Sequence, residues 1–190
     1  MDDTPISLLS RVCNPTDSGA WREFDAIYRP MLRRYASSCG LDVHDVDDVV
    51  QSCLATIHQR IVDFSHDRKV GRFRAWLRTM VINRVRNQIA KRRPQEATTQ
   101  DLQGEQQREL LPEQQFDRIW WNEHLRFYLA QIQSVVDQKS YLAFESYVIE
   151  QIDAADVCRR FDLTRQQLYK LKWQMTQRLR HKMAGLLDES

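Results

Sequence analysis

The chain has 190 residues, which fits one large domain or two small ones. Hydrophobic residues make up 42% and charged residues 28%, so the chain can bury a core, and five Gly and five Pro exclude collagen-like or low-complexity structure. The 28 basic and 26 acidic side chains give a net charge of only +2, which by itself indicates no polyanionic partner.

The N-terminal eleven residues carry acids at Asp2 and Asp3 and lack an apolar stretch, so we expect no secretory signal. No apolar run approaches the roughly 20 residues that a membrane helix needs, which predicts no membrane insertion. The four cysteines show no CxxC spacing and the five histidines pair with no second ligand. We therefore expect free thiols in a cytoplasmic protein, and no metal or cofactor.

The N-terminal half is predicted to begin with one long helix. Apolar residues recur at intervals of three and four almost throughout the chain, which predicts helices rather than strands. The first predicted helix covers residues 20–38, with Asp17 or Ser18 as its N-cap and Gly40 as its stop signal. Its apolar side chains form a single stripe, which predicts that one face packs against a core.

Two further helices complete the N-terminal half. Asp42 is the predicted cap of the first, with Asp45 at the third position, close to a capping box. After a loop at residues 63–71, a long helix is predicted to span residues 72–92. Pro94 ends it, because proline disfavours a helical conformation in the residue before it.

A change in composition separates the two halves of the chain. Residues 95–116 are rich in Gln and Glu, nearly free of aromatic side chains, and interrupted by Gly104 and Pro112. This composition predicts a flexible linker. We therefore expect an N-terminal domain at residues 1–94 and a C-terminal domain at residues 117–190.

The C-terminal domain is predicted to hold four helices. One begins near Phe116, and a second lies at about residues 141–150. Asp153 caps a short third helix at residues 154–161.

A turn and a basic helix end the chain. The turn is Asp162–Leu163, and Thr164 then caps the last helix, with Gln167 three residues on completing a capping box. A short helix, a brief turn and a capped basic helix are typical of the helix-turn-helix motif that reads DNA. Asp162 stands where such turns usually have glycine.

The charges are concentrated in two blocks. Residues 64–94 carry ten basic side chains and one acidic, residues 159–182 carry eight and one, and the acidic segment 95–117 separates them. Two such blocks favour two contacts with a polyanion, although solvated helix faces would give the same pattern. Three aromatic residues lie among the basic residues of the first block: Phe64, Phe73 and Trp76. This combination suits single-stranded or melted DNA, because Lys and Arg pair with phosphates and aromatic rings stack on unpaired bases. Core packing is the better interpretation for Trp76.

The last helix has two distinct faces at helical spacing. The buried seam is expected to hold Leu168, Leu171, Met175 and Leu179, and the opposite face Arg165, Gln166, Tyr169, Lys170 and Trp173. Arg and Gln near a helix N-terminus are the side chains that pair with base edges in the major groove. A solvated helix, or a protein-binding helix anchored by Trp173, remains the alternative.

Four acids near the start of the second helix, Asp42, Asp45, Asp47 and Asp48, could suggest a metal-dependent nuclease. Helix capping accounts for two of them, and neighbouring helical residues point about 100° apart and do not converge on one ion. The sequence holds no nucleophile–base pair or phosphate-binding glycine loop, so we expect no enzyme.

Three stretches carry a resemblance to a known family: DVDDVVQSCL at residues 45–54, FRAWLRTMVINRVRNQIAKRR at residues 73–93, and VCRRFDLTRQQLYKLKWQMTQRLR at residues 157–180. They resemble bacterial RNA polymerase sigma factors, above all the small extracytoplasmic-function (ECF) type of the sigma-70 family. The resemblance implies an all-α fold of two small helical domains, one like sigma region 2 and one like the region 4 helix-turn-helix, joined by a flexible linker.

The resemblance also implies roles for individual residues. The family's docking helix binds a coiled coil of the polymerase largest subunit, and the matching positions are Asp47, Asp48 and Gln51. The positions that match the family's residues for melting and recognising the minus-ten element are Ser65, His66, Arg68, Lys69, Arg72, Arg78, Asn83, Arg84 and Arg86. The positions that match its residues for recognising the minus-thirty-five element are Arg165, Gln166, Tyr169, Lys170 and Lys172. After the docking Gln the family often has Glu, where this chain has Ser52.

The function implied is transcription initiation, in which the protein binds RNA polymerase core, directs it to promoter DNA and opens the minus-ten element. The resemblance further implies an anti-sigma factor as an inhibitory partner. Two alternatives remain open: a stand-alone helix-turn-helix regulator, which would usually dimerise on a palindromic site, and a module that binds only protein.

Overall fold

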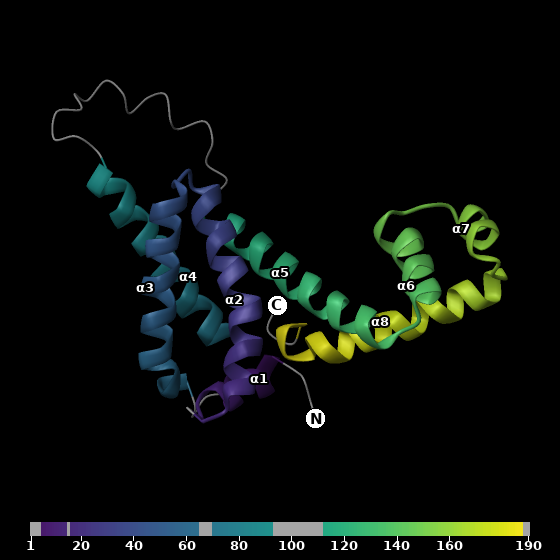
Figure 1. The fold of residues 1–190 in the computed structure, drawn as a ribbon, viewed down its shortest axis with the longest axis horizontal. Helices are drawn as coiled ribbons and strands as arrows, with labels where there is room; N and C mark the ends of the chain where they lie inside the picture. Colours follow the sequence, from purple (N-terminus) through teal and green to yellow (C-terminus); the bar gives the residue numbers. More distant parts are fainter. Residues whose placement is uncertain (1–4, 15, 65–69, 93–111, 188–190) are drawn as a thin grey trace, which may run out of the picture. The chain divides into compact units, whose positions relative to one another are not determined.

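The computed structural model describes residues 5–14, 16–64, 70–92 and 112–187 (Figure 1). Within these ranges every regular element is helical, which confirms the expected all-α fold. The chain divides into two compact units, one of residues 6–124 and one formed chiefly by residues 125–188. None of the described helices combines the length and apolarity needed to cross a membrane.

Two helices open the first unit, α1 (Pro5–Val12) and α2 (Ser18–Ser38). The Asp17 carboxylate accepts a hydrogen bond from the Ala20 N–H at 2.8 Å, which identifies Asp17 as the N-cap of α2. Gly40 has a φ of 83°, a conformation that favours glycine, and it follows the end of the helix as predicted. The sequence analysis missed α1, because two turns contain too few repeats to establish a period.

Two longer helices follow. Helix α3 (Val43–Arg60) begins at Asp42, whose carboxylate accepts a hydrogen bond from the Asp45 N–H at 3.0 Å, so the predicted cap is confirmed. The 3-10 helix η1 (Ile61–Phe64) continues directly from α3. Helix α4 (Val70–Arg92) begins two residues before the predicted start.

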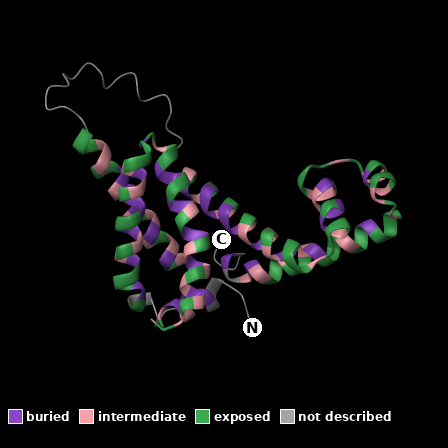
Figure 2. Cartoon of the chain, viewed as in Figure 1, coloured by how far each residue is buried: buried purple, intermediate pink, exposed green. Residues whose placement is uncertain are grey.

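The core of the first unit is aromatic. Phe24 and Tyr28 of α2 pack against Phe73 of α4, with ring centroids 5.9 and 5.4 Å apart. Trp120 joins them, 5.5 Å from Tyr28, and all four side chains are fully buried. Figure 2 shows buried positions running along each of these helices, alternating with exposed ones. Phe73 is therefore a core residue and presents no free π-face.

Helix α5 spans Pro112–Val135 and begins earlier than the sequence analysis expects. Residues 112–116, predicted as the end of the linker, are helical. Pro112 is the first residue of the helix, where proline is favourable because its fixed φ suits the helix and no N–H partner is required. The rest of the predicted linker, residues 95–111, lies outside the described residues.

The first unit extends along α5 as far as His124, so it includes residues 117–124, which the sequence analysis assigns to the C-terminal domain. An ion pair of 2.6 Å between Arg34 of α2 and Glu123 adds to the burial of Trp120. Periodicity shows which face of a helix is buried but not which element covers it.

The second unit continues with α6 (Gln138–Phe144), the π-helical turn η4 (Glu145–Ile149), α7 (Ala154–Phe161) and α8 (Arg165–Leu187). Its core has two clusters of buried side chains, which together contain Ile132, Ala143, Phe144, Val157, Leu168 and Met175. Leu171 and Leu179 pack against these clusters, so the predicted seam of α8 is confirmed.

The turn between α7 and α8 is defined by local hydrogen bonds. Asp162 adopts the left-handed conformation, with φ 48° and ψ 60°, and the Leu163 N–H donates to the Cys158 carbonyl at 3.0 Å. Aspartate tolerates this conformation better than most residues, which explains how the turn forms without glycine. The Thr164 hydroxyl accepts from the Gln167 N–H at 3.2 Å, and Gln167 Oε1 accepts from the Thr164 N–H at 2.8 Å, so the predicted capping box is confirmed.

Candidate nucleic-acid and protein interfaces

The acids at the start of α3 have different partners. Asp42 and Asp45 both pair with Arg92 of α4, and Asp47 pairs with Arg33 of α2. The Asp45 N–H and then Arg92 hold the pKa of Asp42 below its ordinary value. Asp48 is exposed and has no ion-pair partner among the described residues. The described residues contain no group of ligands suited to a metal ion.

Of the three residues predicted for protein docking, two project from α3 into solvent. Asp48 and Gln51 are exposed and lie about one turn apart. Asp47 is half-buried and is held by Arg33. The exposed part of the predicted docking surface is therefore Asp48 and Gln51, with Asp47 joining α3 to α2.

The polar side chains of α4 point in three directions. Arg72, Asn83 and Arg86 are exposed, and at about 100° per residue they fall within one narrow face of the helix. Arg78 and Arg84 are half-buried and lie on either side of that face. Of the five residues predicted on this helix, three therefore form one exposed group, and the other two contact neighbouring helices.

Arg84 joins α4 to α3. Its Nε donates to the Ser52 hydroxyl at 2.9 Å, and its Nη2 donates to the Thr56 hydroxyl at 2.6 Å. Ser52 accepts the first of these bonds, and Thr56, one turn further along α3, accepts the second. Arg84 therefore fixes the spacing of the two helices.

We expect Arg84→Ala to lower the free energy of unfolding of the first unit by about 1–2 kcal/mol, because it removes two hydrogen bonds to a charged donor. Urea unfolding measures this loss. Arg86→Ala is the matched control: it removes an exposed arginine from the same helix and should change stability by less than about 0.5 kcal/mol. Equal losses in the two variants would contradict the bridging role.

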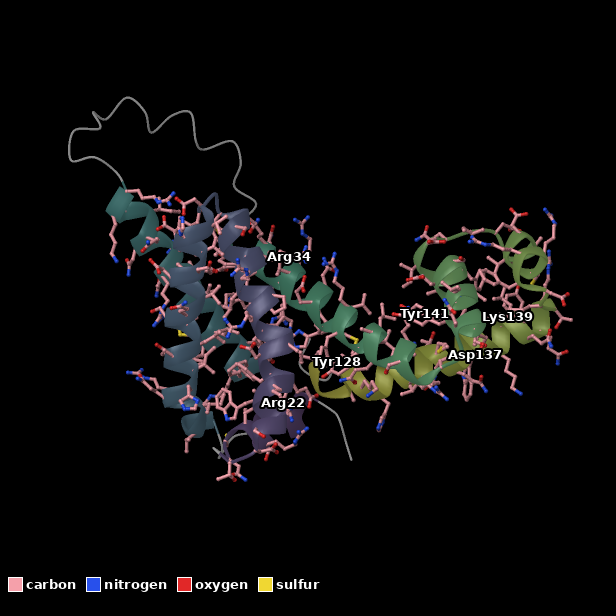
Figure 3. All side chains as sticks on the ribbon, in the orientation of Figure 1. Arg22, Arg34, Tyr128, Asp137, Lys139 and Tyr141 are labelled. Atoms are coloured by element: carbon pink, nitrogen blue, oxygen red, sulfur yellow. The ribbon has the colours of Figure 1, made fainter. Side chains whose placement is uncertain are left out.

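Arg78 faces α5. Asp117 lies 2.8 Å from Arg74 and 3.7 Å from Arg78. The Arg74 guanidinium also lies 5.5 Å from the ring centroid of Trp121. Figure 3 labels Arg34, the α2 arginine that pairs with Glu123 of α5. Asp117 at the start of α5 therefore pairs with two arginines of α4, which the sequence analysis did not foresee.

The predicted loop contacts Ser65, His66, Arg68 and Lys69 lie outside the described residues. The side chain of Phe64 does too. Trp76 is half-buried, 5.8 Å from the Phe73 ring, which fits its interpretation as a packing residue.

Helix α8 presents the five residues predicted for the second nucleic-acid contact. Arg165, Gln166, Tyr169, Lys170 and Lys172 are all exposed. Trp173, on the same face as Tyr169, is 64% exposed, so a second large aromatic side chain lies on this face. The face combines cations, an amide and aromatic rings, the side chains that proteins use on nucleic acids.

A tyrosine outside α8 adjoins this face. Tyr147 of η4 lies 5.2 Å from the Lys172 Nζ, measured from its ring centroid, and 6.1 Å from the Tyr169 ring. The sequence analysis missed Tyr147, because nothing in the order of residues indicates which side chain of η4 lies beside α8.

Comparison with known families gives one match, which lies within the first unit. Residues 26–95 match the family model described as Sigma-70 region 2, a stretch that runs from α2 to just past the end of α4. A comparison with curated proteins found no match. The family match covers about a third of the chain and includes the exposed faces of both α3 and α4. It supports membership of the sigma-70 family and a role in transcription initiation, and this family is not an enzyme family.

Proposed function

We propose that this chain, which carries a sigma-70 region 2 domain at residues 26–95, is a sigma factor of the ECF type that binds RNA polymerase core and directs it to specific promoters. The observation that carries the proposal is the family match at residues 26–95. In this part of the chain, α3 presents an acidic exposed face and α4 presents a basic exposed face. The protein supplies sequence specificity and strand opening, and the polymerase supplies the catalytic site.

Core binding is assigned to α3. Asp48 and Gln51 are exposed there and make no ion pair with another described residue, so both can meet a basic partner surface. Asp47 supports the surface through its ion pair with Arg33. The docking partner would be the coiled coil of the polymerase largest subunit, as in the family.

Minus-ten recognition is assigned to the exposed face of α4, together with Ser65, His66, Arg68 and Lys69. Arg72 and Arg86 supply positive charge to that face, and Asn83 supplies hydrogen-bonding groups. Arg78 would reach DNA after Asp117 releases it, and Arg84 would act by holding α4 against α3. Promoter melting would then rest chiefly on the exposed part of the basic block, which suits a factor that binds DNA tightly only within the polymerase complex.

Minus-thirty-five recognition is assigned to α8. Its N-terminal residues Arg165 and Gln166 would read base edges, and Lys170 and Lys172 would meet phosphates or bases further along the groove. The short helix α7 would lie across the DNA backbone, as in helix-turn-helix proteins. An anti-sigma factor that masks one or both basic faces is part of the same proposal, on the family resemblance.

Run-off transcription tests the proposal directly. The purified full-length chain is added to bare polymerase core with a pool of genomic promoter fragments. We expect new transcripts that depend on the chain and begin at a common sequence. Binding to DNA without core and without new transcripts would favour the stand-alone regulator, and binding to neither DNA nor core would favour the protein-only module.

The α8 assignment predicts a loss of upstream contact. Arg165→Ala or Lys170→Ala should weaken binding of the holoenzyme to the upstream element by about 1–3 kcal/mol, the usual value of one direct base contact. Footprinting on a promoter recovered by transcription measures the loss. Gln177→Ala is the control, because Gln177 is exposed on α8 but lies about three turns beyond Arg165 and two turns beyond Lys170. Unchanged footprints would remove the substituted residue from the contact surface.

A further inference from the structure

Tyr147 occupies a well-defined position beside the exposed face of α8. It belongs to η4, a single π-helical turn, and such turns are rare and frequently occur at functional sites. The Glu150 N–H donates to the Glu145 carbonyl at 3.0 Å, and the Ile152 N–H donates to the Ser146 carbonyl at 3.0 Å. These bonds fix the backbone on both sides of Tyr147, so its place does not depend on a bound partner.

The ring of Tyr147 contacts two of the residues assigned to upstream recognition. The Lys172 ammonium lies 5.2 Å from its centroid, within the range of a cation–π interaction. The Tyr169 ring lies 6.1 Å away at 43°. Burial and then the neighbouring Tyr169 raise the pKa of Tyr147, so the phenol stays neutral at physiological pH.

An open cavity of about 470 Å³ brings these side chains together. Its lining includes Tyr147, Arg165, Tyr169 and Lys172, so three of the five residues assigned to α8 share one surface with a residue of η4. The only carboxylate in the lining is Asp153, which accepts a hydrogen bond from the Ala155 N–H as the cap of α7. The cavity is therefore positively charged, with aromatic rings forming part of its wall.

The contact has a consequence for recognition. A lysine side chain has a long flexible stem, and ordering it on binding costs conformational entropy. A ring that holds the ammonium before DNA arrives reduces that cost and limits the directions in which the ammonium can point. Tyr147 can therefore influence which bases Lys172 and Tyr169 meet, without touching DNA itself.

We propose that Tyr147 is a positioning residue for the minus-thirty-five element, which sets the pose of Lys172 and Tyr169. This inference rests on the proposed function of α8. Tyr147 sharpens base preference at the positions that these two residues read, and contributes about two- to fivefold to affinity, the range of an exposed cation–π contact.

The test uses holoenzyme assembled from the full-length chain and a promoter library with a randomised upstream element. Tyr169→Ala and Lys172→Ala first show which positions those residues read. Tyr147→Leu and Tyr147→Met then remove the π-face by two routes, so that a folding defect in one does not decide the result. Tyr147→Phe keeps the π-face, and Ile149→Ala alters an exposed residue of the same turn that does not line the cavity.

We expect both aliphatic variants to lose base preference at those positions and two- to fivefold in affinity, and Tyr147→Phe and Ile149→Ala to keep the wild-type preference. An unchanged preference in the aliphatic variants would overturn the inference, and so would a uniform loss at every position, which indicates only a weakened fold. A wild-type holoenzyme with no upstream preference at all would instead overturn the proposed function of α8, and this inference with it.

Discussion

Asp48→Arg is expected to abolish binding of the chain to RNA polymerase core while leaving its fold intact. Asp48 is exposed on α3 and has no ion-pair partner among the described residues, so replacing it breaks no intramolecular bond. If α3 meets a basic coiled coil, reversing this charge places like charges together, which costs several kcal/mol and weakens binding by about 100-fold or more. Co-purification and titration with labelled core measure the loss.

The same helix provides a control for this prediction. Gln59 is exposed on the same face as Asp48 and lies about three turns further along α3. Gln59→Arg adds a positive charge without altering the proposed contact and should retain core binding. Circular dichroism should show the same helicity for both variants. If Asp48→Arg still co-purified with core at the wild-type level, α3 would not be the docking helix.

Local features of the fold were predictable from the sequence. The caps Asp17, Asp42 and Asp153, and the box formed by Thr164 and Gln167, are all present, because a cap depends on residues within one helical turn. The periodicity also predicted the buried seams, since a helix with one apolar stripe must bury that stripe.

Tertiary contacts were not predictable in the same way. The sequence places Arg78, Arg84 and Arg86 in one basic block, yet one faces Asp117, one bridges to Ser52 and Thr56, and one is exposed. A helical wheel separates these directions only when the neighbours of the helix are known. The first half of α5 is buried in the first unit, although a polar segment separates it from α4 in the sequence. The composition of the chain gave no indication that α5 lies beside α4.

The division of the α4 arginines limits what the basic block can do. Asp117 holds Arg74 and Arg78, so a DNA phosphate must compete with a carboxylate already in place. Arg72 and Arg86 lie on the exposed face of the helix. Substitutions of the individual α4 arginines should therefore weaken promoter binding by unequal amounts. The charge count alone would predict equal losses, because it treats the basic block as one uniform patch.

Acidification from pH 7 to pH 5 is expected to destabilise the first unit through His124. This side chain is fully buried, with its ring 4.5 Å from the Trp120 ring. Its Nδ1 donates to the Trp120 carbonyl at 2.8 Å, which leaves Nε2 to accept from the Tyr28 hydroxyl at 3.4 Å. The imidazole is therefore neutral in the folded protein.

Burial and the nearby positive charge of Arg74 lower the pKa of His124 to about 4, although the hydrogen bond to the Trp120 carbonyl opposes the shift. In the unfolded chain the pKa is about 6.5. Protons therefore bind the unfolded chain first as the pH falls, so the stabilisation that is present above pH 6.5 is lost progressively between pH 6.5 and pH 4. Between pH 7 and pH 5 the expected loss is about 2 kcal/mol of the free energy of unfolding.

Tryptophan fluorescence can follow this loss in the first unit alone. Four of the five tryptophans lie in residues 6–124, and Trp173 lies in the second unit, so a Trp173→Phe background reports only the first unit. His124→Phe retains an aromatic ring beside Trp120 but cannot titrate. It should be less stable at pH 7, because it lacks both hydrogen bonds, yet the fall in stability from pH 7 to pH 5 should be smaller by about 2 kcal/mol. Urea titrations at pH 7 and pH 5 give the free energy of unfolding of both proteins at each pH. If that free energy fell by the same amount in both proteins, carboxylates elsewhere, and not His124, would set the acid sensitivity of this unit, which bears the proposed core-binding and minus-ten surfaces.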